Sequence, residues 1–133
     1  MATVTKETLI AASPDQVWDA IRDFHAVHER VAPGFLIAAV AEGNDRILTF
    51  FNGAVVRERL VGCDEATRRL AYTIVAGRYD YHHASFQVFP HEAGSRVVWI
   101  TDLLPDSLAE LSNMMMERGA AVMKQTLEAA AKR

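Results

Sequence analysis

The sequence predicts an α+β domain in which a seven-stranded antiparallel sheet curves around one long C-terminal helix. Three observations lead to this fold class. Residues 106–133 contain no proline and a single glycine, and their apolar side chains recur at helical spacing. Most of residues 3–104 outside one early helical stretch follow the two-residue period of strands. Turn residues interrupt this part at intervals, so that it divides into short strands.

The chain is expected to form a single domain over residues 1–133. Half of its residues are hydrophobic, which is enough for one buried core at this length. A net charge of −3 without a polybasic segment argues against nucleic acid as a partner. No apolar run reaches the roughly 18–20 residues that span a bilayer, and the first residues lack a signal-peptide core. With a single cysteine, Cys63, these features predict a cytoplasmic protein.

The first predicted strand, residues 3–11, leads into the sharpest local signal of the sequence. This signal is Ser-Pro-Asp-Gln at residues 13–16. Ser13 suits a helix N-cap, and Gln16 can return a hydrogen bond to the cap residue, as in a capping box. A short helix should follow, and a second short helical segment is expected at residues 25–31.

Six further strands are expected between residues 35 and 104. Asn52-Gly53 predicts a two-residue hairpin of type I′, because both central residues of that turn need positive φ. In this register Thr49 faces Val56 on the neighbouring strand.

The remaining registers follow from the same logic. Extending the first hairpin places Ile47 opposite Glu58, and the next turn would place Glu58 opposite Tyr72. A four-residue turn at residues 92–95 would place Val88 opposite Trp99.

Charged positions predict which face of the sheet meets the helix. Arg57 and Arg59 share one face of their strand, and Arg96 and Asp102 share one face of theirs, so these faces should be solvated. The inner face then comprises Thr49, Val56, Glu58, Leu60, Leu70, Tyr72, Ile74, Ala84, Phe86, Val88, Val97, Trp99 and Thr101. An apolar set remains on the outer face, namely Leu48, Phe50 and Val55. This outer set indicates either a wrong hairpin register or the subunit contact of a homodimer.

The predicted C-terminal helix, residues 106–133, has a broad apolar face with charged side chains opposite. Asp106 or Ser107 should cap its free N–H groups. The apolar face consists of Leu108, Leu111, Met115, Gly119, Val122, Met123, Thr126 and Ala130, with Ser112, Met116 and Leu127 beside it.

Two features of this helix bear on a binding site. Of three successive methionines, Met115 and Met116 should reach the interior, either as core filling or as the deformable wall of a pocket, while Met114 points to water. Gly119 in mid-helix costs about 1 kcal/mol relative to alanine, which indicates a close approach to a strand or a ligand.

Three separated segments carry a resemblance to a known superfamily. They are residues 10–18 (IAASPDQVW), residues 57–72 with Arg-Glu-Arg-Leu at one end and Arg-Leu-Ala-Tyr at the other, and residues 94–99 (GSRVVW). In this order they resemble the helix-grip fold of the SRPBCC superfamily, which includes START domains, birch-pollen-type allergens and polyketide cyclase/dehydrase-like proteins. The resemblance covers nearly the whole chain. It implies a cavity between sheet and helix for small apolar or amphipathic ligands, and it is specific for fold rather than function.

Glu58 is the most informative candidate for chemistry. An inward carboxylate among apolar side chains would have a raised pKa and would suit a general acid or base, or a ligand hydroxyl. The alternative is a structural Glu58 that is hydrogen-bonded to Tyr72 or paired with an arginine. The catalytic candidates are Glu58, Tyr72 and His82. The expected ligand-binding residues are Thr49, Glu58, Tyr72, Phe86, Trp99, Met115, Met116 and Gly119.

Other chemistries find little support in the sequence. The pairs His25/His28 and His82/His83 do not direct two imidazoles at one metal without further ligands, so no metal or cofactor is expected. Ser85, with His83 and Asp102, has the residue types of a hydrolase triad but no nucleophile elbow.

Three functions therefore follow as hypotheses. The first is binding of a small hydrophobic or amphipathic ligand between sheet and helix. The second is an enzyme in the same cavity, of the cyclase or dehydratase type and without a cofactor. The third is a protein-interaction module with a filled core. An open apolar pocket favours the first, converging polar groups in such a pocket favour the second, and a filled interior favours the third.

Overall fold

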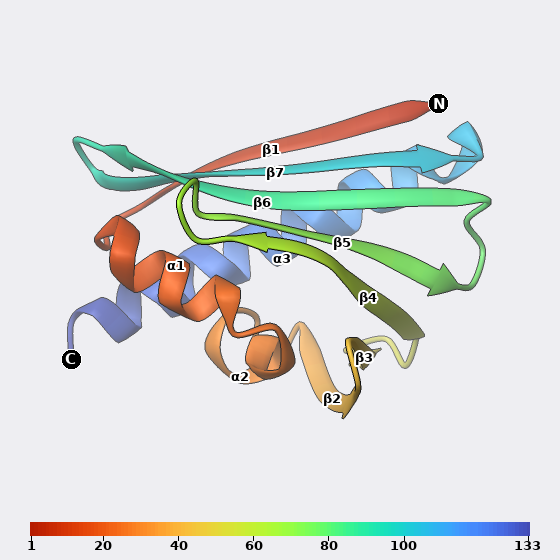
Figure 1. Cartoon of the computed structure of the whole chain (residues 1–133), viewed down its shortest axis with the longest axis horizontal. Helices are drawn as coiled ribbons and strands as arrows, with labels where there is room; N and C mark the ends of the chain where they lie inside the picture. The colour runs from red at the N-terminus through yellow and green to blue at the C-terminus, as the bar shows by residue number, and fades with distance from the viewer.

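The computed structural model describes all residues, 1–133, and confirms the predicted fold class. One antiparallel sheet has the strand order β1-β7-β6-β5-β4-β3-β2. Its strands are β1 (Ala2–Ile10), β2 (Leu36–Glu42), β3 (Asp45–Phe50), β4 (Val55–Asp64), β5 (Arg69–Ala76), β6 (Tyr81–His91) and β7 (Gly94–Leu104). The α-helices are α1 (Pro14–Arg22), α2 (Val27–Arg30) and α3 (Ala109–Ala131), and short 3₁₀ turns precede α2 and α3. In Figure 1, α3 runs behind the sheet, with α1 and α2 at one end.

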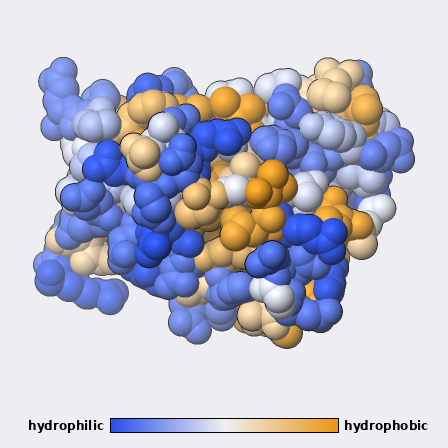
Figure 2. Space-filling view, in the orientation of Figure 1, coloured by the Kyte–Doolittle hydropathy of each residue, from blue (hydrophilic) through white to orange (hydrophobic).

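The face of the sheet turned away from α3 is mostly polar. Figure 2 shows hydrophobic surface gathered near the middle of this view, over β4 and β5, with hydrophilic residues around it.

None of the helices combines the length and the apolarity that crossing a membrane requires.

The predicted start of α1 is confirmed. The backbone N–H of Gln16 donates to Oγ of Ser13 over 3.2 Å, and the Gln16 side chain accepts from the backbone N–H of Ser13. This capping box satisfies two N–H groups that would otherwise lack partners at the helix end. It fixes where β1 turns into α1 at the edge of the core.

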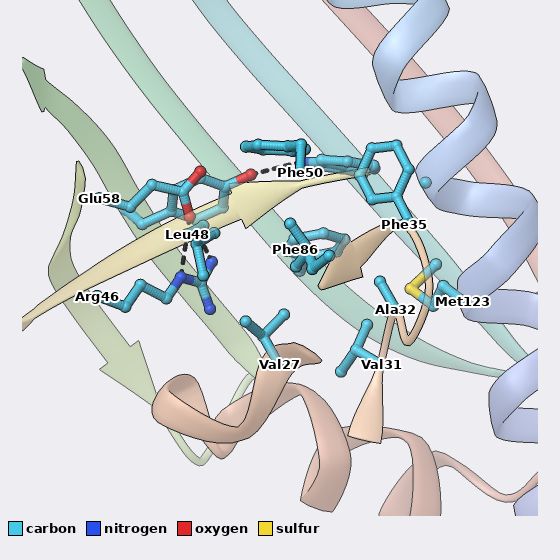
Figure 3. A pocket seen from close by; sticks show the side chains of 14 residues that line it. Val27, Val31, Ala32, Phe35, Arg46, Leu48, Phe50, Glu58, Phe86 and Met123 are labelled. Atoms are coloured by element: carbon cyan, nitrogen blue, oxygen red, sulfur yellow. Dashed lines mark hydrogen bonds and ion pairs between the residues drawn. The ribbon is translucent and has the colours of Figure 1, made fainter. Parts of the chain in front are cut away.

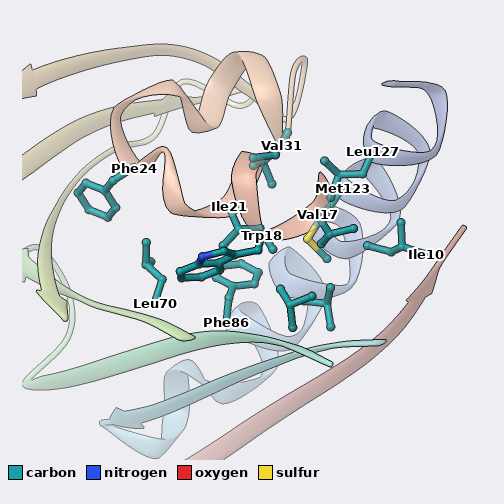
Figure 4. Close-up of a cluster of buried hydrophobic side chains, with 14 of the residues drawn as sticks. Ile10, Val17, Trp18, Ile21, Phe24, Val31, Leu70, Phe86, Met123 and Leu127 are labelled. Carbon is teal, nitrogen blue, oxygen red and sulfur yellow. The ribbon is translucent and has the colours of Figure 1, made fainter. Parts of the chain in front are cut away.

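The core lies between α1, the inner face of the sheet and the second half of α3. Figure 4 shows Met123 and Leu127 of α3 directed toward Val17 of α1. Met123 is 2% exposed and Val17 is fully buried. A polar depression of about 440 Å³ lies outside this core, between α1, α2 and the last turns of α3. The two spaces between the sheet and α3 lie beside Gly119 and Met123 and beside the first half of the helix.

The predicted β3–β4 hairpin register is wrong by one residue. Phe50 accepts a hydrogen bond from Gly53 and donates one to Ala54, which makes a three-residue turn. Only Gly53 has a positive φ, at 85°, so the type I′ requirement is not met at Asn52. Thr49 therefore opposes Val55 instead of Val56.

This slip reverses the faces of β3. A one-residue change in register moves every side chain of a strand to the other face. Leu48 is 2% exposed and Phe50 lines the interior, so the predicted outer patch of Leu48 and Phe50 is wrong. Thr49, expected to bind ligand, alternates with them and lines neither interior cavity. The side chain of Arg46 also points to the interior, and the residue is 4% exposed.

The other register errors amount to two residues and leave the faces unchanged. Glu58 opposes Ile74 instead of Tyr72, and Asp64 opposes Arg69 next to the β4–β5 turn. The register of β4 with β5 also shifts between Leu60 and Gly62 and between Arg57 and Glu58. Trp99 opposes Phe86 instead of Val88, because the β6–β7 turn is shorter than predicted. Glu58, Tyr72, Phe86 and Trp99 still face α3, as expected from the charge pattern.

The buried face of α3 is rotated from the predicted one. Its buried residues are Ser112, Met116, Gly119, Ala120, Met123 and Leu127. Leu111 is 40% exposed and Met115 is half-buried, so both lie at the edge of this face. The expected cap by Asp106 or Ser107 is wrong, because a 3₁₀ turn over Asp106–Leu108 precedes α3 and no side chain caps the helix.

Candidate ligand-binding site

A pocket of about 360 Å³ lies between the concave face of the sheet and the first half of α3. Such volumes are typical of sites for small molecules. Of the 20 residues that line it, 13 are hydrophobic. Its wall from the sheet and its loops contains Phe50, Asn52, Ala54, Val55, Val56, Glu58, Tyr72, Ile74, Ala76, Gly77, Arg78, Tyr79, His82, Trp99 and Thr101. The rest of the wall contains Phe35, Leu111, Ser112, Met115 and Met116.

A second, smaller chamber of about 70 Å³ lies deeper, toward α2. Figure 3 shows its lining, in which Val27 and Val31 approach from the α2 side and Met123 from α3. Five residues line both spaces: Phe35, Phe50, Glu58, Tyr72 and Trp99. These five side chains therefore form the inner end of the larger pocket.

Glu58 at this inner end is paired with Arg46. Nη2 of Arg46 lies 2.7 Å from Oε1 of Glu58, and Nε donates to the same oxygen over 2.9 Å (Figure 3). The two residues are 4% and 6% exposed. Arg46 also donates to the carbonyl of Phe24 and stacks 3.9 Å from the centre of its ring. The buried charge of Glu58 is thus neutralised by a fixed guanidinium, as in the structural alternative.

Tyr72 and Trp99 form a second polar contact beside this pair. Nε1 of Trp99 donates to the hydroxyl oxygen of Tyr72 over 3.1 Å. The Trp99 ring stacks on Phe86 with 4.6 Å between ring centres. Burial raises the pKa of Tyr72 far above its ordinary value, and the negative charge of Glu58 acts in the same direction. Tyr72 therefore remains a neutral hydroxyl whose proton can be offered to a ligand.

His82 lines the outer part of the pocket next to Tyr79. Its Nδ1 accepts a hydrogen bond of 3.1 Å from the backbone N–H of Ile74, so the proton of the neutral imidazole is on Nε2. Burial lowers the pKa of His82 from 6.5 to about 4, with a smaller contribution from His83. The Tyr79 ring meets His82 edge-on, and its hydroxyl lies 2.8 Å from Oγ of Ser112 on α3.

The lowered pKa of His82 predicts acid sensitivity. Between pH about 6.5 and 4 the unfolded chain binds a proton at this residue and the folded chain does not, so the free energy of unfolding falls as the pH falls. We expect a loss of about 2 kcal/mol through His82 between pH 6.5 and pH 4.5. Denaturant unfolding across this range measures it.

The variant His82→Asn is the comparison for this test, because an amide oxygen can accept the Ile74 N–H and does not titrate. Ion pairs also lower the pKa of acidic groups such as Asp45 and Asp19, which adds a slope of the same sign to both proteins. The difference between the two slopes isolates His82. Parallel pH profiles would contradict the prediction.

The remaining predicted site residues divide between the two spaces. Met115 and Met116 line the larger pocket. Phe86 and Gly119 line the smaller chamber. A Cβ at Gly119 would lie 3.2 Å from Phe35 and 3.3 Å from Trp99, so glycine allows α3 to approach these rings.

Sequence reasoning missed Arg46, Phe35, Phe50, Arg78 and Tyr79. A signal for Arg46 existed, since an arginine and a glutamate on adjacent strands can pair across a hairpin. The correct hairpin register places Arg46 directly opposite Glu58. Phe35, Arg78 and Tyr79 lie outside regular strands, where side-chain periodicity gives no direction. No group of three or more His, Cys, Asp or Glu side chains converges in the structure.

The curved antiparallel sheet, the long helix against it and the pocket between them define the helix-grip class of the SRPBCC superfamily. The chain belongs to the family described as polyketide cyclase / dehydrase and lipid transport, whose model matches residues 1–133. The resemblance of the three sequence segments is thereby confirmed.

Solved structures share this fold. A protein from Bacillus thuringiensis has a TM-score of 0.83 at 21% identity, covering 95% of this chain and 98% of its own. A protein from Thermobifida fusca has a TM-score of 0.79 at 29% identity, covering 100% and 95%. A norcoclaurine synthase variant from Thalictrum flavum, in complex with a transition-state analogue, has a TM-score of 0.72 at 15% identity, covering 98% and 94%. No curated protein matches the sequence.

Proposed function

We propose that the protein binds a small hydrophobic or amphipathic molecule in the pocket between the sheet and α3. The observation that carries this proposal is the open, largely apolar volume of about 360 Å³ with its few polar groups. A ligand would place its apolar part against Phe50, Trp99 and Met115. The free oxygen Oε2 of Glu58 and the hydroxyl of Tyr72 offer an acceptor and a donor at the inner end.

An enzyme of the cyclase or dehydratase type remains the alternative, because the same family name includes such activities and norcoclaurine synthase shares the fold. The titration behaviour of the site favours binding. A general acid or base works best with a pKa near the working pH. The pKa of Tyr72 is raised far above that range, and the pKa of His82 is lowered to about 4. Glu58 is occupied by Arg46.

The open interior argues against the protein-interaction hypothesis. It required a filled interior and an outward patch that includes Leu48 and Phe50. The interior holds an open pocket, and both side chains point into the interior.

The two tryptophans test the binding proposal. Trp99 lines the pocket, while Trp18 belongs to α1 and its Nε1 donates to Glu65 over 2.8 Å. In a Trp18→Phe variant, we expect the emission of Trp99 to shift on saturable binding of decanol, because the alkyl chain replaces water near the indole. Fluorescence titration and isothermal calorimetry measure the shift and the stoichiometry.

A Trp99→Phe variant is the matched control. It keeps Trp18 outside the pocket, so its emission should change little while calorimetry still detects decanol. Saturable binding that shifts only Trp18 would place the site elsewhere. Absence of saturable binding to the wild-type chain would overturn the proposed function.

A further inference from the structure

Two arginines lie beside the larger pocket, Arg78 as a lining residue and Arg118 next to lining residues of α3. Arg78, in the segment between β5 and β6, lines the pocket and is exposed. Arg118 follows Leu111 and Met115 at helical spacing on α3, so it shares their edge. Its guanidinium lies 3.9 Å from the ring centre of Phe51, in the β3–β4 turn. The mouth is therefore bordered by positive charge on two of its sides.

These charges have no counter-ion within the protein. Most other arginines are paired, for example Arg57 with Glu42 and Arg96 with Glu7, whereas neither Arg78 nor Arg118 forms an ion pair. Glu58 is the one carboxylate among the lining residues, and Arg46 neutralises it at the inner end. Although the chain carries a net charge of −3, the mouth of the pocket is locally positive.

The charged group of a ligand could lie either at the inner end of this pocket or at its mouth. Deep burial of an anion at the inner end would be unfavourable, because water is excluded there and the one buried guanidinium, that of Arg46, is already paired with Glu58. At the mouth an anion keeps part of its hydration and gains charge-assisted hydrogen bonds from a guanidinium. The pocket thus combines an apolar interior with a mouth that favours an anion over a cation.

We propose that the ligand is an amphipathic anion whose apolar part fills the pocket and whose carboxylate-like head group stays at the mouth beside Arg78 and Arg118. This proposal rests on the proposed function and names the ligand class of the same site. The geometry does not favour an alkylammonium head group, because both arginines would repel it.

The test compares decanoate with decanol, which share an apolar chain and differ in head group. An exposed ion contact is worth a factor of about two to five in affinity. In the Arg78→Gln/Arg118→Gln double variant, we expect the affinity for decanoate to fall roughly tenfold and the affinity for decanol to change less than about twofold. Added salt should weaken binding of decanoate to the wild-type chain and leave decanol binding nearly unchanged.

The variant Arg69→Gln is the control for the loss of an arginine outside the pocket. Arg69 is exposed on β5, forms no ion pair and does not line the pocket, so its loss should leave both affinities unchanged. An unchanged ratio of decanoate to decanol affinity in the double variant would overturn the head-group proposal, while decanol binding would still support the proposed function. If neither probe binds the wild-type chain, both proposals fail.

A membrane lipid could supply the same anionic chemistry, and sedimentation with phosphatidylglycerol vesicles distinguishes this source. We expect monomeric decanoate to bind and vesicles not to sediment the protein. Sedimentation that depends on Arg78 and Arg118, without binding of decanoate, would mean that the rim contacts a bilayer surface and would overturn the proposal.

Discussion

Replacing Glu58 by Gln is expected to lower the free energy of unfolding by about 3–5 kcal/mol. The substitution preserves the shape of the side chain but removes the charge opposite Arg46. Arg46 is 4% exposed and enclosed by the rings of Phe24 and Tyr72, so its guanidinium would remain buried without a counter-ion. Denaturant unfolding at neutral pH measures the loss.

The double variant Arg46→Met/Glu58→Leu separates the pair from its parts. Replacing both partners by apolar residues of similar volume is often neutral or stabilising, so this variant should be clearly more stable than Glu58→Gln. If Glu58→Gln keeps its full stability but loses ligand affinity, Glu58 serves the ligand instead of the fold. That outcome would restore the functional interpretation that its inward position first indicated.

The second large effect is expected at Met123. This side chain is 2% exposed among the core residues between α1, α3 and the sheet. Met123→Ala would remove these buried contacts and enlarge the smaller chamber, which Met123 lines, with a loss of about 2–5 kcal/mol. Thermal or denaturant unfolding measures it.

The neighbouring methionines provide the controls. Met115 is half-buried at the wall of the open pocket, so Met115→Ala removes fewer buried contacts and should be clearly milder. Met114 is 61% exposed, and Met114→Ala should stay within about 0.5 kcal/mol of the wild type. Equal losses at Met115 and Met123 would mean that the pocket is closed in solution.

The sequence predicted those parts of the molecule that depend on neighbours along the chain. The capping box of Ser13 and Gln16 needs only four consecutive residues. The inward direction of Glu58, Tyr72 and Trp99 follows from the alternation within each strand, and it survived register errors of two residues. A shift by two leaves every side chain on its own face.

The tertiary structure decided what depends on pairing between strands and on side chains outside them. A single residue in the turn at Gly53 moved Thr49 out of the site and Arg46 into it. Local sequence does not determine this choice, because an inward arginine is unfavourable until the carboxylate of Glu58 on the next strand neutralises it. Arg46 is therefore buried beside Glu58, and the inner end of the pocket exists only in the folded chain.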